Sequence, residues 1–248
     1  MSVQAAAYSL KMKRMSKMAI IWYEEYDFIS NPFTIKPQES TEDFFGQQEI
    51  IKKLVANIKK GDMALVLGDF GTGKTTILKG IIDRYKGKRK VVYYNAYTSE
   101  KSIDYEDILV RGGSRLSSVF GIKSKDMILL LDEVHNFMKK DFENLVKYYY
   151  DGYFKSVILV TSEIGYKLPK EVMEIVKNNV YTLKPLAEEA AIKLVESRME
   201  GVELLSKDII KKILKKSKSP RDFMMRCDDA CRKAVERGSD KVEAQDID

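Results

Sequence analysis

The feature that most constrains this chain is a glycine-rich segment between an apolar run and a helical pattern. Residues 68–75 read Gly-Asp-Phe-Gly-Thr-Gly-Lys-Thr, which is the spacing G-x-x-x-x-G-K-T. The apolar run before it, Met63–Leu67, predicts a buried strand, and the residues after it predict a helix. A strand, a loop of this spacing and a helix, in that order, are typical of a phosphate-binding loop.

The residue types in this loop suit a nucleoside triphosphate. Glycine lets backbone N–H groups approach the phosphates closely, and the following helix presents its positive dipole end. Lys74 is placed to reach the β- and γ-phosphates, and the Thr75 hydroxyl is placed to bind Mg²⁺. Without a ligand we expect Lys74 to face solvent. ATP and Mg²⁺ are therefore the predicted cofactors, and the predicted nucleotide contacts are Gly68, Asp69, Phe70, Gly71, Thr72, Gly73, Lys74, Thr75 and Thr76.

A second motif lies further along the chain, where the apolar run 127–131 ends in two acids, Asp132 and Glu133. A continuous apolar run indicates a central parallel strand, and ligands bind at the carboxyl ends of such strands. Asp132 is therefore expected beside the phosphate loop, where it would hold Mg²⁺. Glu133 is expected to act on the attacking water as general base, which favours hydrolysis over nucleotide binding alone.

Two further segments place polar side chains near the same site. Thr161 and Ser162 follow the apolar run 157–160 and are positioned to bond the γ-phosphate or the lytic water; the alternative is that these hydroxyls cap backbone groups. Arg221 follows Ser219 and Pro220, a pair that fits a helix start. Its side chain would reach the γ-phosphate, or else be an exposed helical arginine.

The overall pattern predicts an α/β fold: a P-loop core with a central parallel sheet flanked by helices, followed by a small three-helix lid. Strands are predicted at 63–67, 90–95, 127–132, 156–162 and 180–183. After residue 185 the periodicity is helical only, with amphipathic segments at 187–200, 207–216 and 220–237. We therefore expect an N-terminal arm at 1–30, a nucleotide-binding domain at 31–185 and a helical lid at 186–248.

Composition limits the partners and the compartment. Lys and Arg together number 43 against 37 Asp and Glu, a net charge of +6 that favours polyanions. The dense, lysine-dominated charge resembles thermophile usage. No apolar run is long enough to span a membrane, and no signal peptide is recognisable, so the expected location is cytoplasmic.

Cys227 and Cys231 are four residues apart in a helical segment, which predicts buried free thiols.

The chain resembles the AAA+ ATPases, and within them the initiator and loader branch of archaeal origin-recognition and cell-division-control proteins and DnaA. The resemblance covers roughly residues 31–248. It rests on the phosphate loop, the acid-tipped strand, Thr161-Ser162 at the sensor-1 position, Ser219-Pro220-Arg221 at sensor 2, and two looser segments, 44–47 and 183–186. It implies ATP-driven assembly or remodelling on DNA, with a homo-oligomer or a helicase or replication protein as partner.

The chain also departs from that branch. It stops after the predicted lid, where initiators carry a winged-helix domain that reads DNA. Residues 167–183 contain Lys but no Arg to act on a neighbouring subunit. Arg111 or Arg115 could substitute; the alternatives are that the protein hydrolyses ATP slowly, or functions as a monomer or with a partner. His135, in Asp-Glu-Val-His, is reminiscent of transposition-accessory ATPases and some helicases, and we favour a structural or coupling role for it over a catalytic one.

Three functions remain open on the sequence. The first is a DNA-associated ATPase, as a replication initiator-like protein, helicase loader or transposition-type regulator, binding DNA without sequence preference. Its candidate DNA surfaces are the region of Arg111 and Arg115 and the helix of Lys211–Lys218, with a solvated surface as the alternative for each. The second is a scaffold or signalling ATPase that binds a protein partner and no nucleic acid. A small-molecule kinase fits least, because Glu133 and the helical lid favour hydrolysis.

Overall fold

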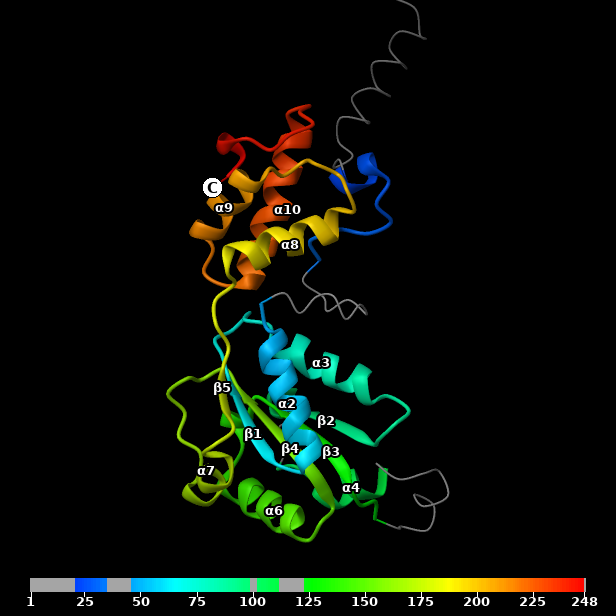
Figure 1. The fold of residues 1–248 in the computed structure, drawn as a ribbon, viewed down its shortest axis with the longest axis vertical. Coiled ribbons are helices and arrows are strands. Elements are labelled where there is room, and N and C mark those ends of the chain that lie inside the picture. The colour runs from blue at the N-terminus through cyan, green and yellow to red at the C-terminus, as the bar shows by residue number, and fades with distance from the viewer. Residues whose placement is uncertain (1–20, 35–45, 99–101, 112–122, 248) are drawn as a thin grey trace, which may run out of the picture. The chain divides into compact units, whose positions relative to one another are not determined.

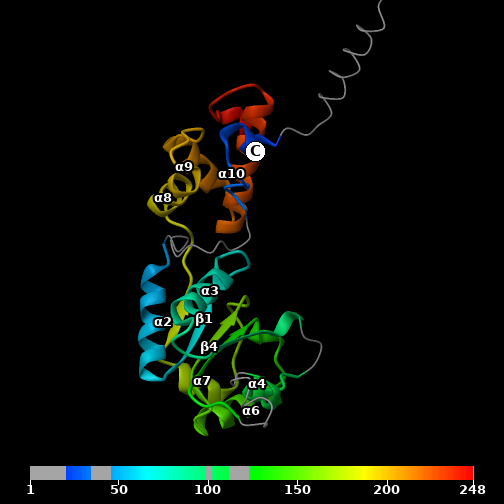
Figure 2. The same ribbon diagram turned by 90° about the vertical axis from the view of Figure 1, so that its right-hand side faces the viewer.

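The structure is a computed structural model, and it describes residues 21–34, 46–98, 102–111 and 123–247. The chain forms two compact units (Figures 1 and 2). Of the described residues, those between 46 and 190 and residues 218–221 form the nucleotide unit, and residues 21–34, 191–217 and 222–247 form the helical unit. No helix in the described parts of the chain is long and apolar enough to cross a membrane.

The nucleotide unit contains the predicted parallel sheet (Figure 1). Its five strands are all parallel and lie in the order β2-β3-β4-β1-β5. Because β1 and β3 are covered on both faces, their sequences read as continuous apolar runs. The strand bounds are β1 Met63–Leu67, β2 Val91–Asn95, β3 Met127–Asp132, β4 Phe154–Thr161 and β5 Val180–Thr182.

Alternate residues of the strands face opposite sides of the sheet, as the twofold period of a strand requires. Ile128 and Leu130 of β3 pack in one buried cluster, with residues of α2 (Gln48–Lys60) and α3 (Lys74–Tyr85). Leu129 and Leu131 pack in the other, with the helices of the opposite face. Those helices are α4 Tyr105–Arg111, α6 Lys139–Tyr150 and α7 Lys170–Val176, and the short turns η3 Ala96–Thr98 and η4 Val134–Asn136 lie beyond β2 and β3.

The helical unit is built from the three predicted C-terminal helices, α8 Glu188–Met199, α9 Lys207–Lys216 and α10 Pro220–Glu236, followed by η5 Ala244–Asp246 (Figure 2). Cys227 and Cys231 are free and buried in α10, as predicted. Burial raises the pKa of both thiols well above the ordinary cysteine value, so they are protonated core groups.

The described part of the N-terminal segment packs on α10 and adds to this core. Trp22, in η1 (Trp22–Tyr26), donates its indole N–H to Asp228 Oδ1 at 2.7 Å, and Asn31 donates to the same oxygen at 2.9 Å. Trp22 stacks on Phe33, and both rings are almost fully buried. Trp22 and Phe33 are therefore part of the helical unit's core, which the sequence pattern did not indicate.

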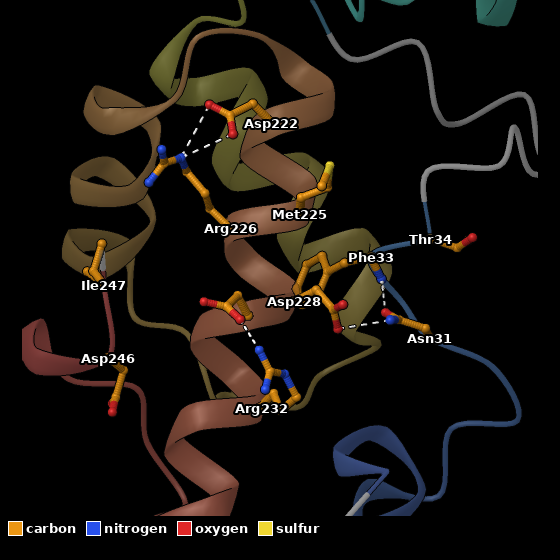
Figure 3. A pocket seen from close by; sticks show the side chains of 11 residues that line it. Asn31, Phe33, Thr34, Asp222, Met225, Arg226, Asp228, Arg232, Asp246 and Ile247 are labelled. Carbon is orange, nitrogen blue, oxygen red and sulfur yellow. Dashed lines mark hydrogen bonds and ion pairs between the residues drawn. The ribbon is translucent and has the colours of Figure 1, made fainter. Parts of the chain in front are cut away.

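A hollow of about 670 Å³ opens beside this contact, between the N-terminal segment, α10 and the end of the chain. Figure 3 shows Asn31 and Phe33 beside Asp228, with Arg226 paired to Asp222 one turn apart on α10. The acids and arginines of this hollow largely pair with each other. All its lining residues belong to the helical unit, and none belongs to the phosphate loop.

Candidate nucleotide site

The predicted loop connects β1 to α3 at the carboxyl end of the sheet. Gly73 is the residue before α3 and has φ 96°, and Gly71 has φ 79°, left-handed conformations that side chains disfavour. The Thr72 hydroxyl donates to the Asp69 carbonyl oxygen at 2.7 Å, which closes the loop on itself. The loop thus places the N-terminal end of α3 where a phosphate group would bind.

The Lys74 side chain folds back over the loop. Its ammonium donates to the Asp69 carbonyl oxygen at 3.0 Å, and the residue is only 6% exposed. The expectation that Lys74 faces solvent is therefore wrong. The loop carbonyl and the nearby carboxylates stabilise the ammonium group in a buried position. Burial lowers the pKa of Lys74, and the charges of Glu133, Asp132 and Asp69 act in the opposite direction.

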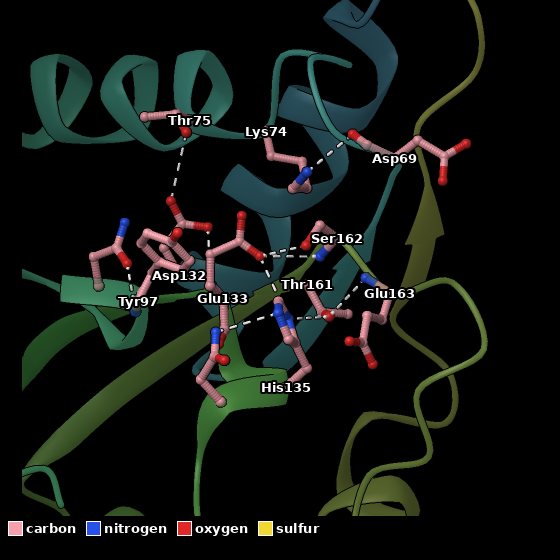
Figure 4. Close-up of polar contacts among 12 residues, drawn as sticks. Asp69, Lys74, Thr75, Tyr97, Asp132, Glu133, His135, Thr161, Ser162 and Glu163 are labelled. Carbon is pink, nitrogen blue, oxygen red and sulfur yellow. Dashed lines mark hydrogen bonds and ion pairs between the residues drawn. The ribbon is translucent and has the colours of Figure 1, made fainter. Parts of the chain in front are cut away.

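The two predicted magnesium ligands meet at the end of β3 (Figure 4). The Thr75 hydroxyl lies 3.5 Å from Asp132 Oδ2. The same oxygen accepts a hydrogen bond of 3.1 Å from the hydroxyl of Tyr93 on β2, and Oδ1 accepts the backbone N–H of Glu133 at 3.0 Å. Burial is the main cause that raises the pKa of Asp132, with the charge of Glu133 adding to it, whereas the bond from Tyr93 lowers it.

These groups fit Mg²⁺ bound together with a nucleotide. Hydroxyl and carboxylate oxygens are hard donors, and Mg²⁺ usually takes one or two protein ligands with phosphates and water. Across the described residues there is no cluster of three His, Cys, Asp or Glu side chains that could hold a metal without such help. Thr75 and Asp132 would thus hold Mg²⁺ only when phosphate oxygens complete its shell.

Glu133 sits at the turn after β3, where its φ of 56° places a non-glycine residue in the left-handed region. Its Oε2 accepts hydrogen bonds from the Ser162 hydroxyl at 2.7 Å and the Ser162 N–H at 3.2 Å. Thr161, fully buried, contacts His135 Nδ1 at 3.0 Å and accepts the N–H of Glu163. Both predicted sensor residues therefore lie beside the carboxylate, one in direct contact and one through His135 (Figure 4).

Arg221 and its neighbours belong to the same compact unit as the loop. Its backbone N–H donates to the Gly71 carbonyl oxygen at 3.2 Å, and a Cβ added at Gly71 would lie 2.9 Å from the Cβ of Arg221. The guanidinium lies 5.2 Å from the ring centroid of Phe70, which is 71% exposed. A cation–π contact of this kind orders the arginine over the loop.

Other predicted positions are not brought to the site. Arg111 is the last residue of α4, and Arg115 lies outside the described residues, as do the two phenylalanines at 44 and 45. Sequence reasoning missed Tyr93, whose hydroxyl contacts the predicted magnesium ligand. It also missed the contact between Ser162 and Glu133.

The fold and this loop define a P-loop nucleotide-binding domain, and the parallel sheet flanked by helices matches that class. The chain belongs to the AAA domain family, whose profile matches residues 60–187. The match confirms the resemblance to AAA+ proteins, and a fold of this class implies nucleotide binding. No curated protein sequence matches the chain.

Many solved structures share the fold, and three of them are compared with this chain. Thermotoga maritima RuvB, a Holliday junction branch migration motor, is 19% identical with a TM-score of 0.66, over 85% of this chain and 70% of RuvB. Aeropyrum pernix Orc1, solved in complex with DNA, is 15% identical with a TM-score of 0.66, over 87% and 66%. Cdc6p from Pyrobaculum aerophilum is 16% identical with a TM-score of 0.63, over 87% and 68%. At these identities the likeness is one of fold.

Proposed function

We propose that this protein binds and hydrolyses ATP with Mg²⁺ and uses the cycle to act on DNA. The observation that carries the proposal is the meeting of Lys74, Thr75, Asp132 and Glu133 at the carboxyl end of one parallel sheet. A cation, a pair of metal ligands and a carboxylate beside a phosphate loop are the groups that phosphoryl transfer to water requires.

In this proposal each side chain has a separate task. Lys74 leaves its bond to the Asp69 carbonyl and contacts the β- and γ-phosphates, where its charge offsets the charge that develops on the transferred group. Thr75 and Asp132 hold Mg²⁺, which supplies further neutralisation of the phosphate oxygens when bound. Glu133 orients the attacking water and accepts its proton.

The remaining predicted residues take supporting roles. Thr161 and Ser162 sense the γ-phosphate or water at the tip of β4, and Arg221 contacts the γ-phosphate from the start of α10. The division into an arm at 1–30, a nucleotide-binding domain at 31–185 and a lid at 186–248 stays a prediction, with the difference that residues 21–34 pack with the helical unit. A cytoplasmic location is also part of the proposal. An assembly of several copies, or a helicase or replication partner, would supply the trans-acting cation that residues 167–183 do not provide as arginine.

The DNA part of the proposal is supported by charge and by two of the structures that share the fold. The chain carries a net charge of +6. On α9 the side chains of Lys212, Lys215 and Lys216 are exposed, whereas Ile209, Ile210 and Ile213 are buried on the opposite face. RuvB moves Holliday junctions and Orc1 was solved with DNA. A row of lysines on one helix face suits phosphate contacts, which carry no sequence preference.

The decisive experiment combines turnover and DNA binding. ATP hydrolysis is measured for the natural protein and for Glu133→Gln, which should bind ATP normally and lose about 10²- to 10⁴-fold in turnover. The mobility of duplex DNA is then followed over a range of salt with no nucleotide, with ADP, and with ATP on the Glu133→Gln protein. We expect the tightest binding for Glu133→Gln with ATP, falling steeply with salt.

The outcomes separate the parts of the proposal. Unchanged turnover in Glu133→Gln would contradict the assignment of Glu133 as base. Normal hydrolysis with no DNA binding at low salt in any nucleotide state would contradict the action on DNA, and would favour a scaffold ATPase that binds a protein partner.

A further inference from the structure

The carboxylate of Glu133 is held on one of its two oxygens. Ser162 donates both its hydroxyl and its backbone N–H to Oε2, at 2.7 and 3.2 Å, and His135 Nδ1 lies 3.4 Å from the same atom. The side chains of His135 and Glu133 are only 15% and 19% exposed. Figure 4 shows both sides of this contact, with Ser162 at the end of β4 and His135 on the turn after β3.

The tautomer of His135 follows from its second neighbour. The side-chain amide nitrogen of Asn136 lies 3.2 Å from His135 Nε2, and that nitrogen is a donor only. Nε2 must therefore accept, which places the ring proton on Nδ1. The Nδ1–H group then points between Thr161 Oγ1, at 3.0 Å, and Glu133 Oε2, at 3.4 Å.

In this arrangement one carboxylate oxygen of Glu133 contacts protein groups, and the other is available to a water molecule. Within the part of the chain that the structure describes, the side-chain contacts of this carboxylate are all made by Oε2. Oε1 is thus the oxygen that can meet a water molecule. The left-handed backbone at Glu133 limits where its side chain can start, and the contacts with Ser162 and His135 then set the direction of the carboxylate.

We propose that His135 is a positioning residue that, together with Ser162, orients Glu133 for attack by water and links it to Thr161 at the tip of β4. The proposal rests on the role of Glu133 as base in the proposed function. If Thr161 moves when the γ-phosphate binds, the His135 ring that contacts it would move as well, and its Nδ1–H group would change the direction of the Glu133 carboxylate. His135 itself need not touch the nucleotide or exchange a proton with water.

The test uses two substitutions that differ in where they place a donor. In His135→Asn the amide nitrogen takes the place of Nδ1, and in His135→Gln it takes the place of Nε2. We expect His135→Ala to lose about 10- to 100-fold in kcat with an unchanged ATP dissociation constant. His135→Asn should recover to within about threefold of the natural protein, and His135→Gln should remain close to His135→Ala.

Two controls separate positioning from loss of structure. Ser162→Ala should also lower kcat, whereas Ser156→Ala, at the opposite end of β4, removes a hydroxyl bonded to the Asp62 carbonyl oxygen and should leave kcat unchanged. In a Glu133→Gln background, His135→Ala should cause no further loss, because both changes disable the same step. Circular dichroism checks that each variant is folded.

Several results would overturn the inference without touching the proposed function. These are unchanged kcat in His135→Ala while Glu133→Gln has lost turnover, equal recovery by Asn and Gln, or an effect on ATP affinity alone. If Glu133→Gln itself retains turnover, the proposed function fails first, and this inference fails with it.

Discussion

The two units of this protein differ in where their main groups of charged side chains lie. In the nucleotide unit the charged groups gather at one edge of the sheet and are buried: Lys74 is 6% exposed and Asp132 1%. In the helical unit most ion pairs of α10 join partly exposed side chains, as between Arg232 and Glu236, whose side chains are each 47% exposed. Exposed pairs of this kind contribute little to stability, whereas buried ones shift pKa values and respond strongly to a missing partner.

This difference indicates which substitutions will change nucleotide binding and hydrolysis, and which will change only the binding of a partner. A buried cation such as Lys74 is retained despite the unfavourable burial that lowers its pKa, which is expected of a group held for a ligand. An exposed lysine on α9 changes only the electrostatic surface that a partner meets. We therefore expect the largest effect of a substitution at the buried cation and smaller effects at the exposed charges.

Lys74→Ala should weaken ATP binding by about 100-fold or more, because it removes a charge-assisted contact to the phosphates worth about 3 kcal/mol. Isothermal titration or a fluorescent ATP analogue measures the affinity. The fold should persist, since the loss of attraction to Glu133 and Asp132 is offset by the removal of a buried ammonium. Natural affinity in the variant would rule out the loop as the phosphate site.

Reversing the exposed charges of α9, with Lys212, Lys215 and Lys216 each changed to Glu, should reduce DNA affinity by roughly 10- to 100-fold at low salt. The slope of log affinity against log salt should fall by roughly 0.9 for each phosphate that the variant no longer neutralises. ATP hydrolysis without DNA should be unchanged. The matched control reverses three exposed lysines of α2, Lys52, Lys59 and Lys60, for the same change in net charge. Equal reductions in both variants would mean that α9 is not a specific surface.

The sequence predicted the sheet, the helix after the phosphate loop and the three C-terminal helices because the signals were local. Continuous apolar runs such as the one that ends in Asp132 can only be satisfied by a strand covered on both faces, and the loop spacing located the helix after β1. The short helix α4, Tyr105–Arg111, was not predicted, because its buried side depends on contacts with distant α6, including the bond from the Tyr105 hydroxyl to the Asp141 carbonyl oxygen.

The candidate site was predictable as far as the motifs extend. The loop, Asp132 and Glu133 follow from spacing and from the rule that ligands bind at strand ends. Tyr93 was missed because its position depends on the register of β2 against β3, in which Tyr93 pairs with Leu130 and Asn95 with Asp132. Register between strands far apart in sequence has no local signal. The burial of Lys74 was missed for the same reason, since its surroundings come from β3 as well as the loop.

Arg221→Ala should reduce turnover about tenfold, a change of about 1.4 kcal/mol in the barrier, and alter ATP affinity by only a modest factor. The guanidinium lies over the exposed ring of Phe70, so it is ordered near the loop without occupying the place of the Lys74 ammonium. Steady-state kinetics give kcat and KM separately. A variant with natural kcat would assign Arg221 to the contact with Phe70 alone.

The smallest predicted effect lies in the helical unit, at the junction of its N-terminal segment with α10. Asp228 Oδ1 accepts both the Trp22 indole N–H and the Asn31 amide. Asp228→Asn keeps an acceptor oxygen but removes the charge that strengthens these bonds, at a cost of about 1 kcal/mol in unfolding free energy.

The chain has one tryptophan, so the fluorescence of Trp22 reports on this junction directly. In Asp228→Asn its emission should begin to change at lower denaturant concentration than in the natural protein, with ATP affinity unchanged. Asp229→Asn is the matched control on the next residue, because its partners Arg232 and Lys233 form partly exposed ion pairs within α10. If both variants unfold alike, the bonds to Asp228 do not hold residues 21–34 on the helical unit, and stacking of Trp22 on Phe33 would be the stronger contact.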